Sequence, residues 1–226
     1  MLGIALAAAL AAPTLQAVPA TPTVQTAPAP VRPGADGPQV RDLQKRLRAL
    51  KYDPGSANGH YGETTRAAVW AFQKVNGMRP TGVVNARVRK ALAKPRIPKA
   101  LKPHGARNRV EIDLSRQLLV VYRKGRPALI THISTGSGRR YCDNGRCGMA
   151  RTPVGDFRVT RRVKGWRKSA LGYMYKPLYF HNGYAMHGSL SVPRHPASHG
   201  CVRIPMHTAD LLPRLVRNGD RVYVRR

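Results

Sequence analysis

The chain has 226 residues, 42% of them hydrophobic, which is enough for one large or two small domains with ordinary cores. Its formal net charge of +30 predicts attraction to polyanions such as nucleic acid, anionic lipid or an acidic cell wall. The basic residues are spread along the chain without a zinc-finger, helix-turn-helix or ribonucleoprotein signature, so specific nucleic-acid recognition is disfavoured. The alternative is that the arginine-rich composition only coats a solvated surface.

The first 34 residues predict export and a tether. Residues 1–12 are almost wholly Leu, Ile and Ala, an apolar run that is too short to span a bilayer but typical of a secretory signal. We therefore predict a signal peptide at 1–20, a linker rich in Pro, Ala and Thr at 21–34, and a secreted, wall-associated protein. The positive front end of such signals is absent before Arg32, so a disordered Ala-rich tail is the alternative.

Residues 35–93 are predicted to form three short helices. Pro38 favours the start of the first helix, whose apolar residues recur at three- and four-residue steps. A turn at 58–62 precedes a second helix, which ends at Gly77. Asn85 is expected to cap the third helix.

The rest of the chain reads as a linker followed by a β domain. Residues 94–106 hold three prolines among basic residues, which predicts a stiff second linker. From 107 to 226 the pattern predicts one helix, at 206–216 and containing Pro213, and strands at 110–114, 117–122, 127–135, 156–163, 178–186 and 220–226. The expected fold class is multidomain α+β: a three-helix bundle, then a mainly β sandwich or open barrel with one late helix.

The three cysteines fall into two groups. Cys142 and Cys147 flank a turn-forming Asn-Gly pair, and this spacing suits a small disulfide-closed loop. Cys201 is left over, and an odd cysteine in an exported protein indicates a reactive thiol. Three free thiols are the alternative.

The segment from residue 187 to 203 contains the candidate catalytic residues. A thiol needs a nearby base to attack at neutral pH, and His187 and His199 are candidates beside Cys201. No Asp or Glu lies between Phe157 and Met206, so we expect the Gly188 carbonyl to orient the second ring nitrogen of His187.

Two other interpretations of this stretch remain open. One is a zinc site, although the short paired spacing of structural zinc ligands is missing; its ligands would be His187, His195, His199 and Cys201. The other is that the histidines only satisfy a loop.

Two segments resemble known families. The helical segment, with Asn58-Gly59-His60-Tyr61-Gly62 and Thr81-Gly82-Val83, is similar to the peptidoglycan-binding three-helix module found beside cell-wall enzymes. Residues 107–226 resemble the L,D-transpeptidase catalytic domain (the YkuD family). The motifs behind that second resemblance are Ser134-Thr135-Gly136, Thr152-Pro153-Val154-Gly155-Asp156-Phe157, Met174 to Phe180, His187-Gly188 and Ser198-His199-Gly200-Cys201-Val202-Arg203.

The second resemblance implies an activity. Cys201 would be the nucleophile and His187 the base, and a stem tetrapeptide of peptidoglycan would form a thioester with release of D-alanine before a 3→3 cross-link forms. His199, Gly200, Gly188 and Ser198 would form or position the oxyanion pocket, and Tyr175 and Arg203 would contact substrate. Many family members carry Asn where Arg203 stands, and the loop before Ser198 is short.

The resemblance also implies partners and leaves rivals. No metal or organic cofactor is implied; the partners would be stem peptides and glycan, anionic wall polymers and carbapenem inhibitors. With water as acceptor the same bond would be hydrolysed, as by an L,D-carboxypeptidase. A non-catalytic wall-binding protein is a further alternative. Another cysteine peptidase is disfavoured, because papain-like enzymes place the cysteine before the histidine, although convergent sites permute this order.

Overall fold

The computed structural model describes residues 29–143 and 145–226. The predicted signal peptide and most of the first predicted linker lie outside this range. The three predicted helices of the N-terminal module are confirmed as α1 (Pro38–Ala49), α2 (Glu63–Val75) and α3 (Ala86–Ala93). Asn85 caps α3 as predicted, since its side chain accepts a hydrogen bond from the Val88 N–H. Within the described residues, no helix is long and apolar enough to cross a membrane.

Gln44 is a buried polar side chain at the centre of the module. Gln44 of α1 accepts a hydrogen bond from Gly59 N at 2.9 Å and donates to Thr65 Oγ1 at 2.9 Å. It also donates to the His60 carbonyl at 2.9 Å, so the amide is fully used. This side chain therefore fixes the 58–62 turn against both α1 and α2.

The C-terminal domain is mainly β, as predicted. One five-stranded sheet has the order β3-β2-β1-β12-β6, and its strands are Arg126–His132, Leu118–Arg123, Arg109–Asp113, Arg221–Arg225 and Gly155–Arg158. The second has the order β11-β10-β9-β7 with β8 also paired to β9; the strands are Val202–Pro205, Tyr184–Ser189, Gly172–His181, Arg161–Arg162 and Trp166–Ser169. A separate hairpin joins β4 (Arg140–Asp143) to β5 (Arg146–Met149).

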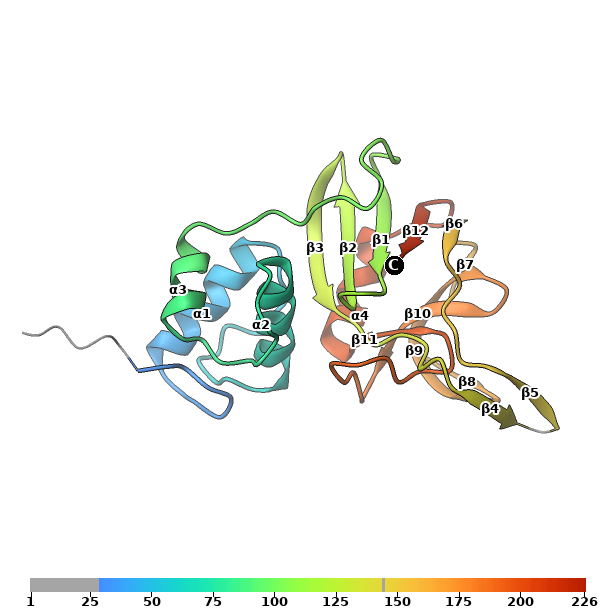
Figure 1. The fold of residues 1–226 in the computed structure, drawn as a ribbon, viewed down its shortest axis with the longest axis horizontal. Helices are drawn as coiled ribbons and strands as arrows, with labels where there is room; N and C mark the ends of the chain where they lie inside the picture. Colours follow the sequence, from blue (N-terminus) through green and yellow to red (C-terminus); the bar gives the residue numbers. More distant parts are fainter. Residues whose placement is uncertain (1–28, 144) are drawn as a thin grey trace, which may run out of the picture.

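Apolar side chains of both sheets form one core, which also includes the late helix α4 (Met206–Leu215). Alternation places Val222 and Val224 of β12 in this core, while Tyr223 faces the other way and its hydroxyl accepts a hydrogen bond from Ala106 N. Pro213 does not break α4, because the helix ends two residues later, at Leu215. The architecture is thus a sandwich with a helix at one side (Figure 1).

Two segments that were each predicted as a single strand are interrupted in the structure. Residues 156–163 form two short strands in different sheets, β6 and β7, because the chain crosses between the sheets at Val159 and Thr160. Residues 178–186 contain a hairpin turn, since Asn182 and Gly183 both have positive φ between β9 and β10. Asn-Gly is a strong hairpin signal, and the apolar residues around it concealed the turn.

The helical module packs directly on the outer face of the first sheet (Figure 1). Its core is continuous with four side chains of that sheet, namely Leu118, Val120, Tyr122 and Ile130. Lys51 and Tyr52 also run beside β3, the edge strand, and the Ile130 N–H donates to the Lys51 carbonyl at 2.8 Å. The module therefore covers a sheet edge as well as an apolar face.

The described end of the first predicted linker also packs on the module. Val31 is buried and pairs with Val84 through two backbone hydrogen bonds of 3.1 and 2.8 Å. This part is therefore not a free tether, because its valine finds an apolar partner that composition alone did not indicate.

We expect Ile130→Ala to lower the free energy of unfolding by about 2–5 kcal/mol, because it opens a cavity between the module and the sheet. The matched control is Ile97→Ala, at a side chain 79% exposed, which should change that free energy by less than about 0.5 kcal/mol. Urea denaturation measures both. Equal effects of the two substitutions would contradict a shared core.

Candidate active site

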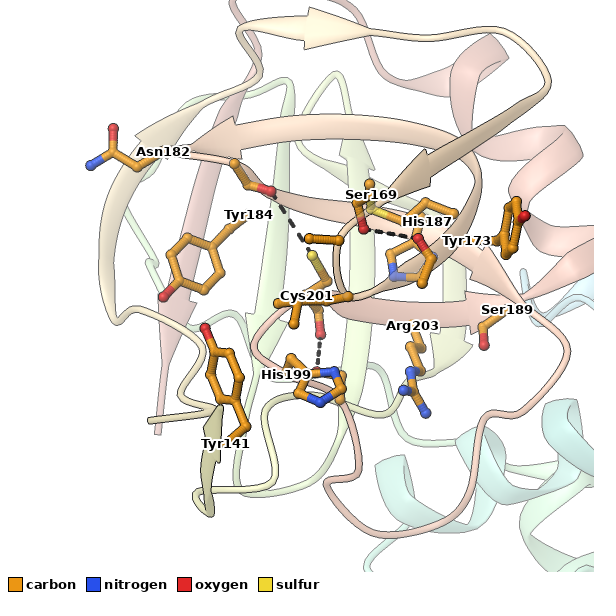
Figure 2. A pocket seen from close by; sticks show the side chains of 16 residues that line it. Tyr141, Ser169, Tyr173, Asn182, Tyr184, His187, Ser189, His199, Cys201 and Arg203 are labelled. Atoms are coloured by element: carbon orange, nitrogen blue, oxygen red, sulfur yellow. Dashed lines mark hydrogen bonds between the residues drawn. The ribbon is translucent and has the colours of Figure 1, made fainter. Parts of the chain in front are cut away.

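Two neighbouring strands bring the predicted nucleophile and base together. His187 lies on β10, and Cys201 directly precedes β11, which runs parallel to β10 with His187 opposite Arg203. Both side chains line one pocket of about 480 Å³. Figure 2 shows them together at its centre. The two residues that the sequence analysis paired therefore line the same pocket.

His187 is held in a defined orientation. Its ring is 5% exposed, and Nδ1 lies 2.9 Å from the Gly188 carbonyl, to which it donates. This is the backbone partner predicted from the absence of nearby carboxylates. Burial lowers the pKa of His187 to about 4, and the Arg203 charge acts in the same direction, while the Gly188 bond opposes it. The imidazole is therefore neutral at pH 7, with Nε2 left to accept a proton.

The Cys201 thiol is also neutral at rest. Burial raises the pKa of Cys201, whereas a backbone hydrogen bond with Ala185 and the Arg203 charge lower it. Cys201 is the one free cysteine in the described residues, and its Sγ lies 4.0 Å from the Gly183 carbonyl. The pair is thus a thiol beside an imidazole, so proton transfer must accompany attack on a substrate.

The turn before Cys201 is fixed by hydrogen bonds from inside the domain. Ser198 Oγ donates to the Cys201 carbonyl at 2.5 Å and accepts from Gly200 N at 3.0 Å. Thr152 Oγ1 donates to the Gly200 carbonyl at 2.7 Å and accepts from Gly136 N at 2.9 Å. Three motifs that are distant in the sequence thus meet behind the sulfur.

Gly200 has a conformation and an environment that other residues do not tolerate. Its φ is +133°, and an added Cβ would lie 2.5 Å from Tyr184 Cε1 and 2.9 Å from the Arg151 carbonyl. Its N–H, predicted to help hold an oxyanion, is instead bonded to Ser198 Oγ. The role of Gly200 is therefore to allow this close packing.

The remaining predicted site residues divide into two groups. Ser198, His199 and Arg203 line the pocket, with Arg203 as its only lysine or arginine among the described residues. Gly188 lies behind the pocket, where an added Cβ would meet Ala209 Cβ at 2.8 Å. Tyr175, predicted to contact substrate, lies outside this lining and donates to Asp210 Oδ1 at 2.9 Å.

Much of the pocket rim was not predicted from the sequence. The β8–β9 hairpin contributes Tyr173, and the β9–β10 turn contributes Asn182 to Tyr184. Tyr141 of the β4–β5 hairpin also lines the pocket, with its ring centroid 5.0 Å from that of His199. The Asn182-Gly183 pair was the available signal for one of these turns. The other rim residues depend on tertiary contacts.

The small hairpin that contributes Tyr141 is closed by a disulfide. Cys142 and Cys147 are opposite each other in the hairpin register and are bonded, as their spacing predicted. The bond lies directly beside Tyr141 and so restrains a part of the rim that pairs with neither large sheet.

The zinc interpretation gains no support from this arrangement. Among the residues that the structure describes, no group of three or more His, Cys, Asp or Glu side chains is placed to hold a metal ion. His195, one of the four residues weighed as ligands, is not part of the pocket lining.

Comparisons with known proteins agree with this architecture. Residues 107–224 match the model of the L,D-transpeptidase catalytic domain (YkuD), and residues 36–92 match a peptidoglycan binding domain. The L,D-transpeptidase of Xylanimonas cellulosilytica, crystallised as residues 123–326, is 40% identical with a TM-score of 0.82, over 88% of this chain and 98% of that one. The chain therefore belongs to the L,D-transpeptidase family, and it is a transpeptidase, an acyl-transferring enzyme.

Two other matches are more distant. The L,D-transpeptidase of Stackebrandtia nassauensis is 24% identical with a TM-score of 0.50, over 87% of this chain and 95% of that one, and shares the fold. The carboxy-terminal processing protease CtpB of Bacillus subtilis is 32% identical over 63 residues. That match covers 28% of this chain, and the chain spans only 13% of the length of that curated relative.

We expect Gly200→Ala to lower the free energy of unfolding by about 1–3 kcal/mol for the backbone conformation alone, with a further loss from the clash with Tyr184. Gly165→Ala is the control, because Gly165 has a φ of +66° but no atom within 4 Å of an added Cβ. Denaturant unfolding of both variants measures the difference. A loss no larger at Gly200 than at Gly165 would remove the proposed steric role.

We expect His187 to make stability depend on pH between about 6.5 and 4. In that window the imidazole is protonated in the unfolded state but stays neutral in the folded state. The free energy of unfolding therefore falls as the pH falls. Between pH 7 and pH 4, the free energy of unfolding should fall by roughly 3 kcal/mol less in His187→Gln than in the wild type. Denaturation curves at several pH values test this, and parallel curves for the two proteins would refute it.

Proposed function

We propose that the protein cross-links peptidoglycan stem peptides 3→3 through a thioester on Cys201, with release of D-alanine. The observation that supports this is the placement of a free thiol and a buried, oriented imidazole in one pocket of an L,D-transpeptidase domain. The geometry suits nucleophilic catalysis, because the base accepts a proton through Nε2 while Nδ1 is already bonded.

The chemistry follows in two steps. Sγ of Cys201 attacks the carbonyl of the L-centre at the third stem residue, and Nε2 of His187 takes the thiol proton. The bond to D-alanine breaks, its nitrogen receives that proton, and a thioester remains. The amine of a second stem peptide then attacks the thioester, which restores the thiol and forms the new amide. The backbone N–H groups of His199 and Cys201 are our candidates for holding the oxyanion in both steps.

Substrate recognition is proposed for two parts of the chain. Arg203 lines the pocket and takes part in no salt bridge within the described residues, so its guanidinium suits a substrate carboxylate. The helical module at 35–93 would hold the wall glycan, joined by residues 94–106 to the catalytic domain at 107–226. The net charge of +30 suits anionic wall polymers, and a secreted, wall-associated location follows from these substrates.

The main rival reaction has the same first half. If water attacks the thioester, the product is a tripeptide, and the enzyme is an L,D-carboxypeptidase. A non-catalytic wall-binding role would leave the oriented His187 and the free Cys201 without a use. Carbapenems, which acylate the family's cysteine, are expected to form an adduct on Cys201.

We expect the purified protein, incubated with a disaccharide-tetrapeptide, to release D-alanine and yield a cross-linked dimer by mass spectrometry. Cys201→Ala should abolish release, and His187→Gln should lower it by at least about a hundred-fold, since general-base catalysis contributes about 10²–10⁴. Tyr175→Phe is a control that removes one hydroxyl outside the pocket. A tripeptide product would establish the rival reaction, and release by Cys201→Ala would overturn the mechanism.

A further inference from the structure

A buried lysine links the helical module to the catalytic domain. Lys74 lies on α2, and its Nζ donates to the Gln117 carbonyl at 3.0 Å and to Nδ1 of His132 at 2.7 Å. Gln117 precedes β2 and His132 ends β3, so one ammonium group joins the module to two elements of the first sheet. His132 is 0% exposed, which makes this contact part of the interior.

His132 continues the connection to the segment that carries the nucleophile. Its Nε2 donates to the carbonyls of Val192 and Pro193, each at 3.1 Å. These residues lie in the 190–201 segment, between His187 and Cys201 in the chain. With Lys74 on one ring nitrogen and the two carbonyls on the other, His132 is fixed as the Nε2–H tautomer.

Gln117 provides a second connection to the same segment. Its Oε1 accepts a hydrogen bond from Thr135 N at 2.8 Å. The Thr135 carbonyl in turn accepts from Ala197 N and Ser198 N, each at 2.9 Å. Both partners of Lys74 therefore connect to the 190–201 segment. His132 does so directly, at Val192 and Pro193, and Gln117 does so through Thr135, at Ala197 and Ser198.

Burying the Lys74 side chain carries a desolvation cost that a residue with only a packing role would not need. Burial lowers its pKa to about 7, with Arg194 acting in the same direction and Asp113 opposing it. Burial also lowers the pKa of His132 to about 3, and the Lys74 charge adds to this, so the imidazole stays neutral. An apolar side chain would pack here without the desolvation cost, and strongly shifted titratable groups gather at functional sites.

We propose that Lys74 is a positioning residue, through which the docked helical module holds the 190–201 segment in the geometry that Cys201 needs. The module would then set the catalytic rate in addition to binding the wall. This inference rests on the proposed function, since its readout is turnover at Cys201. Lys74 touches no substrate and acts only through His132 and Gln117.

The test replaces Lys74 by methionine, which keeps the length of the side chain and removes its donors. With a disaccharide-tetrapeptide as substrate, we expect Lys74→Met in the full chain to lower kcat about ten-fold or more, with KM changed less than two-fold, because misplacement of reacting groups acts on the chemical step. Labelling of Cys201 by iodoacetamide depends on the accessibility and ionisation of the thiol and not on the placement of a substrate carbonyl, so its rate should change less than two-fold.

Two matched variants separate positioning from stability. Asp53→Asn weakens another contact between module and domain, the 2.9 Å bond from Thr208 Oγ1, and should lower Tm without changing kcat well below Tm. Lys74→Gln keeps an N–H donor and should recover most of the lost kcat. If Lys74→Met does not fold, Lys74→Gln takes its place in the comparison with the wild type.

The outcomes are distinct. If the wild type is active while Lys74→Met retains full kcat, the positioning role is wrong. It is also wrong if Asp53→Asn or Lys74→Gln loses as much kcat as Lys74→Met. If the wild type neither releases D-alanine nor forms a dimer or tripeptide, the proposed function itself fails, and this result is independent of any Lys74 variant.

Discussion

The parallel pairing of β10 with β11 is the constraint on which the site depends. Parallel strands need a crossover of a dozen or more residues, and here residues 190–201 make that connection without a helix. An irregular crossover has no internal hydrogen-bond ladder, so its backbone groups must find partners elsewhere. His132, Ser134 and Thr135, at the end of β3 and just beyond it, supply them. The register that places His187 beside the sulfur is therefore stabilised from the other sheet.

The neutral state of the proposed catalytic pair has a chemical advantage. A preformed thiolate is reactive toward any electrophile, whereas a buried thiol reacts when a substrate is positioned for concerted proton transfer. Burial is the main cause of this state, because it disfavours the charged form of both Cys201 and His187. The backbone carbonyl of Gly188 orients the imidazole without adding a negative charge that would raise its pKa further. The Gly188 bond thus orients the ring and only partly opposes the effect of burial on the pKa of His187.

The parts of the structure that were predictable are those with local signals. Helical periodicity located the three module helices, and the Asn85 cap and the 142–147 cysteine spacing were correct. The contact of His187 with Gly188 was predictable because the nearby sequence offers no carboxylate. In these cases the decisive interaction lies within a few residues along the chain.

The parts that were not predictable depend on interactions between distant segments. The segment 156–163 reads as one strand, yet its halves join different sheets, which periodicity cannot indicate. Alternation would place Tyr173 and Tyr175 on the same face of β9, yet only Tyr173 lines the pocket, while the Tyr175 hydroxyl donates to Asp210. The continuous apolar run of β2 indicates a strand buried on both faces, but it does not indicate that the helical module covers the outer one. The Lys74–His132 contact joins residues 58 positions apart.

The continuous core between the module and the first sheet has a consequence for how the two halves can be separated. Leu118, Val120, Tyr122 and Ile130 are buried in one cluster with the core residues of the module. A catalytic half released by cleavage within residues 94–106 would present these side chains to water as one apolar surface, beside the newly uncovered edge of β3. Surfaces of this kind promote self-association, so we expect proteolytic fragments of this enzyme to aggregate rather than to persist as soluble monomers.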